Sequence, residues 1–222
     1  MVDLHKIMSA CDHTLLTQTA SSEDIRRVCG EALRWQVASV CIPPCYVAEA
    51  SAFLDGRIPV CTVIGFPNGY SSASVKCFET AEAIADGADE IDMTANIAYI
   101  KAARYDELFR EIGEIKRIAG SRILKVIVET CLLTDDEKIR MCSLVADAGA
   151  DYIKTSTGFA SGGATREDVA LMAAHLPAGL SLKASGGIRT LEDAQAFLDL
   201  GASRLGSSRL VSLAESAASD LR

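Results

Sequence analysis

Residues 149–187 read GADYIKTSTGFASGGATREDVALMAAHLPAGLSLKASGG and contain one strand–helix–strand repeat. Short β-like runs at 151–155 and 180–185 flank a helical segment that begins after Thr165. Thr165 stands three residues before Asp168, a spacing with which a hydroxyl and an acid cap the free N–H groups at a helix start. Two strands joined through a helix predict a parallel sheet that is covered by helices.

The same unit recurs along the chain. Thr134 and Thr190 each stand three residues before an acid and mark two further helix starts. Glycine ends helices because it adopts the left-handed conformation readily, and three glycines that lead into strands are Gly87, Gly149 and Gly201. Amphipathic helical stretches are predicted at 22–36, 74–86 and 105–119.

The strands decide between a closed and an open sheet. They are predicted at 10–14, 38–42, 60–65, 90–94, 123–129, 151–155, 180–185 and 204–207. Eight units in a chain of 222 residues favour a (β/α)8 TIM barrel of the α/β class, as one catalytic domain over residues 1–222. The first strand has the weakest pattern, and without it the alternative is a seven-stranded open sheet.

Composition excludes several classes of protein. The net charge of −8 argues against general nucleic-acid binding, which depends on clustered Lys and Arg. The first residues lack the basic-then-apolar pattern of a leader peptide, and no run approaches the roughly 20 apolar residues of a membrane span. We therefore expect a cytoplasmic protein with no membrane partner.

Cysteine and histidine do not predict a metal site. The eight cysteines include four in apolar periodic segments, where we expect reduced, structural thiols: Cys29, Cys61, Cys77 and Cys142. Cys41 and Cys45 bracket Ile-Pro-Pro, but no second pair follows at zinc-like spacing. The three histidines are scattered along the chain.

Charged residues occupy one face of several strands. Successive strand residues point to opposite faces, so Asp92, Lys154 and Lys183 are predicted to face the barrel interior, near the carboxyl ends of their strands. Active sites of this fold form at that end. Lys125 and Glu129 share a face of the fifth strand, and we expect them to form a supporting ion pair deeper in the barrel.

Two inward lysines indicate a covalent mechanism. Like charges held close in a partly desolvated site lower the pKa of an amine. A neutral lysine amine can attack an aldehyde and form an iminium, which accepts electrons from a neighbouring carbon–carbon bond. A salt-bridged, purely structural role is the alternative for each lysine, and Asp92 alone could serve only to neutralise one of them.

Glycines and serines after the last two strands predict a phosphate site. Gly186 and Gly187 follow the seventh strand, and Ser207 and Ser208 lie at the end of the eighth. Successive backbone N–H groups there can surround an anion, and barrels frequently bind phosphate at these two loops. Each pair alone is as consistent with an ordinary turn.

Several motifs together resemble the deoxyribose-phosphate aldolase family, which forms Schiff bases. They follow in that family's order and cover nearly the whole chain: DHTLL at 12–16, TVIGFP at 62–67, GADEIDM at 87–93, KTSTGF at 154–159 and KASGGIR at 183–189. The resemblance implies reversible cleavage of 2-deoxy-D-ribose 5-phosphate to acetaldehyde and D-glyceraldehyde 3-phosphate, in deoxyribose phosphate catabolism, without a metal or other cofactor.

The resemblance also implies roles for individual residues. Lys154 would form the Schiff base, and Lys183 would lower the pKa of that amine and handle protons. Asp92 would donate and accept protons through water. Asp12 would contact a substrate hydroxyl or support the network.

Further contacts with substrate are expected from Thr155 and Gly158, in the segment after Lys154, and from Cys41 at the end of the second strand. Three stretches depart from the family pattern, namely Thr17-Gln18, Thr94-Ala95 and Arg209. They lie at the rim of the expected site and affect substrate tolerance and phosphate affinity rather than the lysines.

Other functions remain open at this point. A transaldolase-like enzyme would share the barrel and the phosphosugar, and a non-catalytic phosphosugar-binding barrel would share the fold alone. An isomerase would use a carboxylate base without a covalent lysine. The expected partners are small phosphosugars and aldehydes, and a homodimer or homotetramer is possible because such barrels often pair through outer helices.

Overall fold

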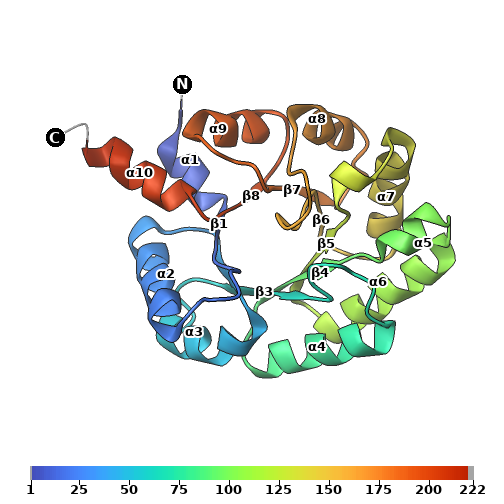
Figure 1. Ribbon diagram of the computed structural model, residues 1–222, viewed down its shortest axis with the longest axis horizontal. Helices are drawn as coiled ribbons and strands as arrows, with labels where there is room; N and C mark the ends of the chain where they lie inside the picture. Colours follow the sequence, from blue (N-terminus) through green and yellow to red (C-terminus); the bar gives the residue numbers. More distant parts are fainter. Residues whose placement is uncertain (1, 220–222) are drawn as a thin grey trace.

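Eight parallel strands pair in chain order and close on themselves, with β8 against β1 (Figure 1). The computed structural model describes residues 2–219. The strands are β1 Cys11–Thr14, β2 Ser39–Ile42, β3 Val60–Ile64, β4 Glu90–Thr94, β5 Ile123–Ile127, β6 Tyr152–Lys154, β7 Ser181–Ser185 and β8 Arg204–Ser207. The closed barrel confirms the predicted fold, and the pairing of β1 with both β2 and β8 excludes the seven-stranded open sheet.

Helices surround the barrel on its outer side (Figure 1). They are α1 Leu4–Ser9, α2 Ser22–Trp35, α3 Val47–Leu54, α4 Ala73–Ala85, α5 Ile97–Lys101, α6 Tyr105–Ala119, α7 Asp135–Asp147, α8 Arg166–Ala174, α9 Leu191–Asp199 and α10 Leu210–Ser219, with short 3-10 turns η1 Pro44–Tyr46 and η2 Thr130–Leu132. Within residues 2–219, none of these helices has both the length and the apolar character that a bilayer crossing requires.

The predicted capping residues at helix starts and ends are confirmed. Thr134, Thr165 and Thr190 each accept a hydrogen bond from the backbone N–H three residues ahead, and Thr134 forms a full capping box with Glu137. These bonds satisfy N–H groups that have no partner inside the helix. The three glycines expected to end helices all have positive φ: Gly87, Gly149 and Gly201.

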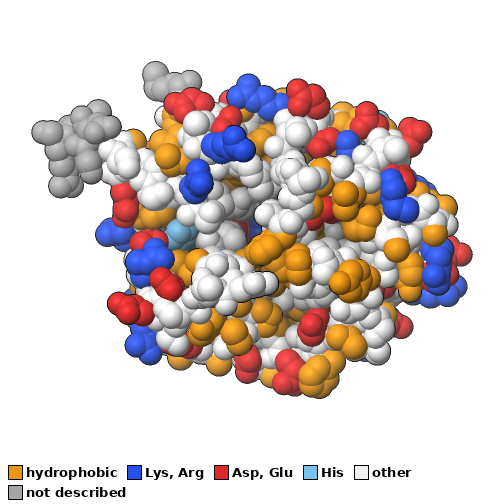
Figure 2. Space-filling model, in the orientation of Figure 1, with side chains coloured by type: hydrophobic (Ala, Val, Ile, Leu, Met, Phe, Trp, Pro, Cys, Tyr) orange, Lys and Arg blue, Asp and Glu red, His pale blue; other side chains and the backbone are white. Residues whose placement is uncertain are grey.

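The barrel has an apolar outer layer and a charged interior. Outward strand residues such as Ile91, Val126 and Ile153 are fully buried against the helices and belong to one large hydrophobic core. Inward residues include Lys125 and Lys183, which are also fully buried. Side chains fill the opening that the ribbon leaves around the barrel axis (Figure 2). The barrel therefore encloses ionised groups, which are costly to bury unless they are paired.

The predicted ion pair between Lys125 and Glu129 is wrong. β5 ends at Ile127, and Glu129 takes a left-handed conformation with φ of 54°, which ends the strand alternation that placed the two on one face. Lys125 instead contacts other carboxylates inside the barrel. The Glu129 carboxylate accepts hydrogen bonds from the backbone N–H of Thr157 at 3.2 Å and from its hydroxyl at 2.5 Å, and so holds the loop after β6.

A buried ion pair outside the barrel interior joins α4 to α6. Lys76 Nζ lies 3.0 Å from Glu111 Oε1 and donates a hydrogen bond to the carbonyl of Thr94 at 2.8 Å. Lys76 and Glu111 are both buried. The pair therefore fixes the carboxyl end of β4 against two helices, just beyond Asp92.

Replacing Lys76 with Met leaves the Glu111 carboxylate buried without its cation. We expect the free energy of unfolding of K76M to fall by about 3–5 kcal/mol in urea titrations at neutral pH. The matched K76M/E111L variant buries no unpaired charge, so it should be more stable than K76M. A double variant that is less stable than the single one would contradict this view of the pair.

Candidate active site

A cavity of about 1080 Å³ opens at the carboxyl ends of the strands. Its walls come from the loops after β1, β6, β7 and β8, and the strand ends themselves contribute Thr14, Lys154, Ser185 and Ser207. This is the end of the barrel at which (β/α)8 enzymes place their active sites. The cavity contains the segments from which sequence analysis predicted both the nucleophile and the phosphate site.

Lys154 is the last residue of β6 and reaches the cavity floor with 3% of its surface exposed. Its Nζ donates a hydrogen bond to Asp92 Oδ2 at 2.7 Å. Lys183 Nζ donates to the same oxygen, also at 2.7 Å, and Lys125 Nζ donates to Asp92 Oδ1 at 2.8 Å. A single carboxylate thus holds three lysines from three consecutive strands.

The pKa values follow from these contacts. Burial raises the pKa of Asp92, but the charges of Lys125, Lys154 and Lys183 outweigh burial and hold this pKa well below its usual range. Burial lowers the pKa of Lys183, but Asp12 and Asp92 outweigh it and raise this pKa above its ordinary value. Lys183 is therefore a permanent cation that shares an oxygen atom with Lys154.

Asp12 belongs to the network beneath the cavity rather than to its lining. It is fully buried, and it contacts Lys183 and Arg204 directly and Lys125 at 3.5 Å. Glu90 completes this layer, with Arg204 at 2.5 Å and Lys125 at 2.6 Å. Sequence analysis missed Arg204. The available signal was its position two residues before Gly206, which gives both residues the same inward register on β8.

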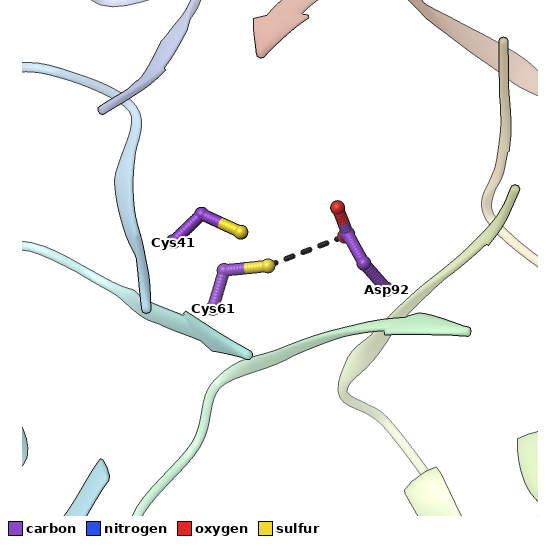
Figure 3. Close-up of side chains that lie close together, drawn as sticks. All are labelled: Cys41, Cys61 and Asp92. Atoms are coloured by element: carbon purple, nitrogen blue, oxygen red, sulfur yellow. Dashed lines mark hydrogen bonds between the residues drawn. The ribbon is translucent and has the colours of Figure 1, made fainter. Parts of the chain in front are cut away.

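Two cysteines face the same carboxylate. Cys41 and Cys61 point from β2 and β3 toward Asp92, and the Cys61 thiol donates to Asp92 Oδ1 at 3.2 Å (Figure 3). All three side chains are fully buried, and Cys41 lies outside the cavity lining. The neighbouring Cys61 thiol lowers the pKa of Cys41, whereas burial raises the pKa of Cys61.

These residues also bear on metal binding. The ligand atoms of Cys41, Cys61 and Asp92 lie within 4.8 Å of one another, a spacing that would admit a thiophilic cation. Asp92 already accepts bonds from three lysines, and Lys125 Nζ is 3.3 Å from Cys61 Sγ. A dication there would lie against several ammonium groups, whose repulsion opposes its binding.

The predicted phosphate loops meet at one side of the cavity. Gly186, Gly187, Ser207 and Ser208 all line it, and the two glycines have φ of 78° and 75°. The N–H of Ala164 donates to the carbonyl of Gly186 at 3.1 Å, which packs the loop after β6 against the loop after β7. Side chains are absent from these glycines, so the backbone is open to an anion.

Two other predicted residues lie in different positions. Gly158 lines the cavity, with φ of 85°. Thr155 is fully buried and joins β6 to β7, because its hydroxyl donates to the Ser185 carbonyl at 3.1 Å and accepts from the Ser185 N–H at 3.0 Å.

The rim agrees with sequence analysis at Thr17, Gln18 and Arg209, whereas Thr94 and Ala95 are buried and do not line the cavity. Sequence analysis did not assign Leu15, Leu16, Thr19 and Arg189, which also line it. Phe159 meets Phe66 edge-on with 5.2 Å between ring centroids, which joins the loops after β3 and β6. Phe159 is 51% exposed. Neither phenylalanine lies in a periodic hydrophobic stretch, so no signal in the sequence indicates this contact.

Comparison with known proteins decides the family. A family model described as DeoC/LacD family aldolase matches residues 6–210. The chain belongs to the DeoC/LacD aldolase family. It is 51% identical over 204 residues to a deoxyribose-phosphate aldolase of Clostridioides difficile, covering 92% of this chain and 93% of the relative. A deoxyribose-phosphate aldolase of Streptococcus pyogenes is 48% identical over 217 residues, 98% of this chain and 97% of that one.

Solved structures agree with this assignment. The deoxyribose phosphate aldolase of Aeropyrum pernix matches with a TM-score of 0.90 at 32% identity, over 98% of this chain and 93% of that chain. The resemblance drawn from the motifs is confirmed, and this DeoC/LacD aldolase is a lyase. Membership of an aldolase family disfavours the non-catalytic barrel.

The loop after β6 packs closely against the loop after β7, and this packing should contribute to stability. A Cβ at Gly163 would lie 2.5 Å from the carbonyl carbon and oxygen of Gly186, so G163A must push the two loops apart. We expect its free energy of unfolding to fall by about 1–3 kcal/mol and its aldolase activity to fall with it. Gly30 lies inside α2 with nothing within 4 Å of a Cβ, so the control G30A should be stabilised by about 1 kcal/mol. A G163A variant as stable and active as the parent would contradict the close packing.

Proposed function

We propose that this DeoC/LacD aldolase reversibly cleaves 2-deoxy-D-ribose 5-phosphate to acetaldehyde and D-glyceraldehyde 3-phosphate, with Lys154 as the covalent nucleophile. One observation carries the proposal. Among the described residues, Lys154 is the lysine that lines the cavity, whereas Lys125 and Lys183 are fully buried below it. Only Lys154 can therefore reach an aldehyde without a rearrangement of the barrel.

Covalent chemistry begins with the neutral Lys154 amine. It adds to the C1 aldehyde of the open-chain sugar, and uptake of one proton with loss of water gives a protonated Schiff base. The electron pair of the C2–C3 bond then moves into this iminium and forms an enamine. The proton of the C3 hydroxyl passes to a base, and C3 leaves as the aldehyde carbon of D-glyceraldehyde 3-phosphate. Protonation of the enamine carbon and hydrolysis release acetaldehyde and restore the amine.

Asp92 and Lys183 support these steps from below. Asp92 lies 2.7 Å from Lys154 Nζ and keeps its negative charge, so it can move protons through water between the nucleophile and the C3 hydroxyl. Lys183 stays protonated beside Lys154 and opposes a second positive charge there. Asp12 holds Lys183 in place from the opposite side.

Substrate contacts extend from this pair to the rim. The phosphate would bind the N–H groups of Gly186 and Gly187 together with Ser207 and Ser208. Gly158 also lines the cavity, next to Gly186. Thr155 and Cys41 would act from beneath the cavity, through the strands that they hold, since both are fully buried.

The remaining assignments follow from the proposed activity. Residues 1–222 would form one catalytic domain that acts in the cytoplasm in deoxyribonucleoside and deoxyribose phosphate catabolism. A homodimer or homotetramer is the expected assembly. The Aeropyrum pernix relative is described as tetrameric, which supports an oligomer here.

Borohydride trapping tests the nucleophile. Reduction in the presence of acetaldehyde should inactivate the enzyme and leave an N-ethyl group on the peptide that contains Lys154. K154M should take up no label, and K183M should still be labelled at Lys154 if it folds. Label found chiefly on Lys183 would refute the assignment.

The phosphate site is tested by adding a negative charge. S208D places a carboxylate beside the expected dianion, so kcat/KM for deoxyribose 5-phosphate should fall by about tenfold or more relative to that for unphosphorylated deoxyribose. Ser203 is exposed at the other end of β8, so S203D adds the same charge away from the cavity and should keep the parental ratio. A ratio that S208D leaves unchanged would move the phosphate elsewhere, with Arg209 as the next candidate.

A further inference from the structure

Seven ionisable side chains from six strands meet inside the barrel: Asp12, Glu90, Asp92, Lys125, Lys154, Lys183 and Arg204. Six of them form a closed ring in which cations and carboxylates alternate. Arg204 joins Asp12 to Glu90, Lys125 joins Glu90 to Asp92, and Lys183 joins Asp92 to Asp12. Three negative charges therefore meet three positive charges, and the ring is neutral.

Lys154 is the seventh group and stands outside this balance. It touches the ring through Asp92 alone, and it occupies the edge that faces the cavity. A protonated Lys154 would give the buried cluster a net positive charge. A net charge in a desolvated interior is costly, so the balance of the other six groups favours the neutral amine.

We infer that Arg204 and Glu90, which lie on the side of the ring away from the cavity, set the protonation state of Lys154 through the net charge of the ring. The inference rests on the proposed role of Lys154 as nucleophile. Neither residue lines the cavity, and 11% of the Arg204 side chain and 3% of the Glu90 side chain are exposed. They are positioning residues, because they act on Lys154 only through other groups.

Other titratable groups lie near the cluster. The Cys11 and Cys61 thiols stay protonated because burial raises the pKa of each. The remaining groups are Cys41 on β2, Tyr152 on β6 with its ring 5.9 Å from Arg204, Glu129 under the loop after β6, and the rim residues Arg189 and Arg209. Because the pKa of Cys41 is lowered, C41S is included as a control that leaves the ring intact.

The experiment changes the ring charge in both directions and then restores it. The readout is the rate at which acetaldehyde forms the borohydride-trapped adduct, measured as a function of pH. R204M removes a cation, which favours a proton on Lys154. The midpoint of the profile should therefore move up by about one pH unit, which corresponds to about tenfold less neutral amine near neutral pH. E90Q removes an anion, so the midpoint should move down. R204M/E90Q is neutral again and should return to the parental midpoint, as should R204K, which keeps the charge.

The double variant separates charge from packing. If the role of Arg204 is purely structural, R204M/E90Q should be no more active than R204M and should have the same pH profile as R204M. That result would overturn the inference. Shifts of R204M and E90Q in the same direction would also overturn it. If R204M does not fold, the inference is tested by E90Q and C41S. The midpoint should move down in E90Q and stay at the parental value in C41S, and an unshifted E90Q would overturn the inference. Peptide mapping of the adduct is done in parallel, since label away from Lys154 in the parent would refute the proposed function instead.

Discussion

The contact on which the rest of the structure depends is the acceptance of three lysines by one buried carboxylate. Asp92 lies at the centre of the barrel, fully buried, with Lys125, Lys154 and Lys183 each within 2.8 Å of its oxygens. Without this carboxylate Lys125 and Lys183 would each lose one of their buried counter-ions and Lys154 would lose its hydrogen-bond acceptor, and each unpaired buried charge costs several kcal/mol. Parallel strands make the contact possible, because inward residues of β4 to β7 come together at similar heights in the barrel.

The two layers of the closed barrel have different roles. The apolar outer layer, where strands meet helices, supplies the burial that stabilises the fold. The charged inner layer holds groups whose positions are fixed by several contacts at once, which suits a site that must keep a reactive amine in one place. Loops after β7 and β8 add an open, glycine-rich wall next to Lys154, which is the arrangement that the proposed cleavage of a phosphosugar requires.

Local features were predictable from sequence, and long-range partners were not. The eight strands, the threonine caps and the inward lysines each follow from residues within a few positions of one another, and the structure confirms the strands and the caps. The prediction that Lys125 pairs with Glu129 was wrong, because it extended the two-residue periodicity of the strand past Ile127, where the chain takes a left-handed conformation at Glu129. Arg204 was missed because its partners, Asp12 and Glu90, lie 192 and 114 residues away, and a strand pattern carries no information on which strand ends face each other.

The central claim is that Lys125 and Lys183 are held as buried cations, whereas Lys154 is the lysine that the substrate aldehyde reaches. NMR of enzyme labelled with carbon-13 at the lysine Cε observes this directly, because the Cε shift reports both the protonation of each amine and its conversion to a reduced adduct. The account predicts that one buried lysine signal moves after reduction with acetaldehyde and borohydride and is absent in K154M, while the signals of Lys125 and Lys183 stay in the charged position throughout. A moving signal that persists in K154M and is lost in K183M would contradict it.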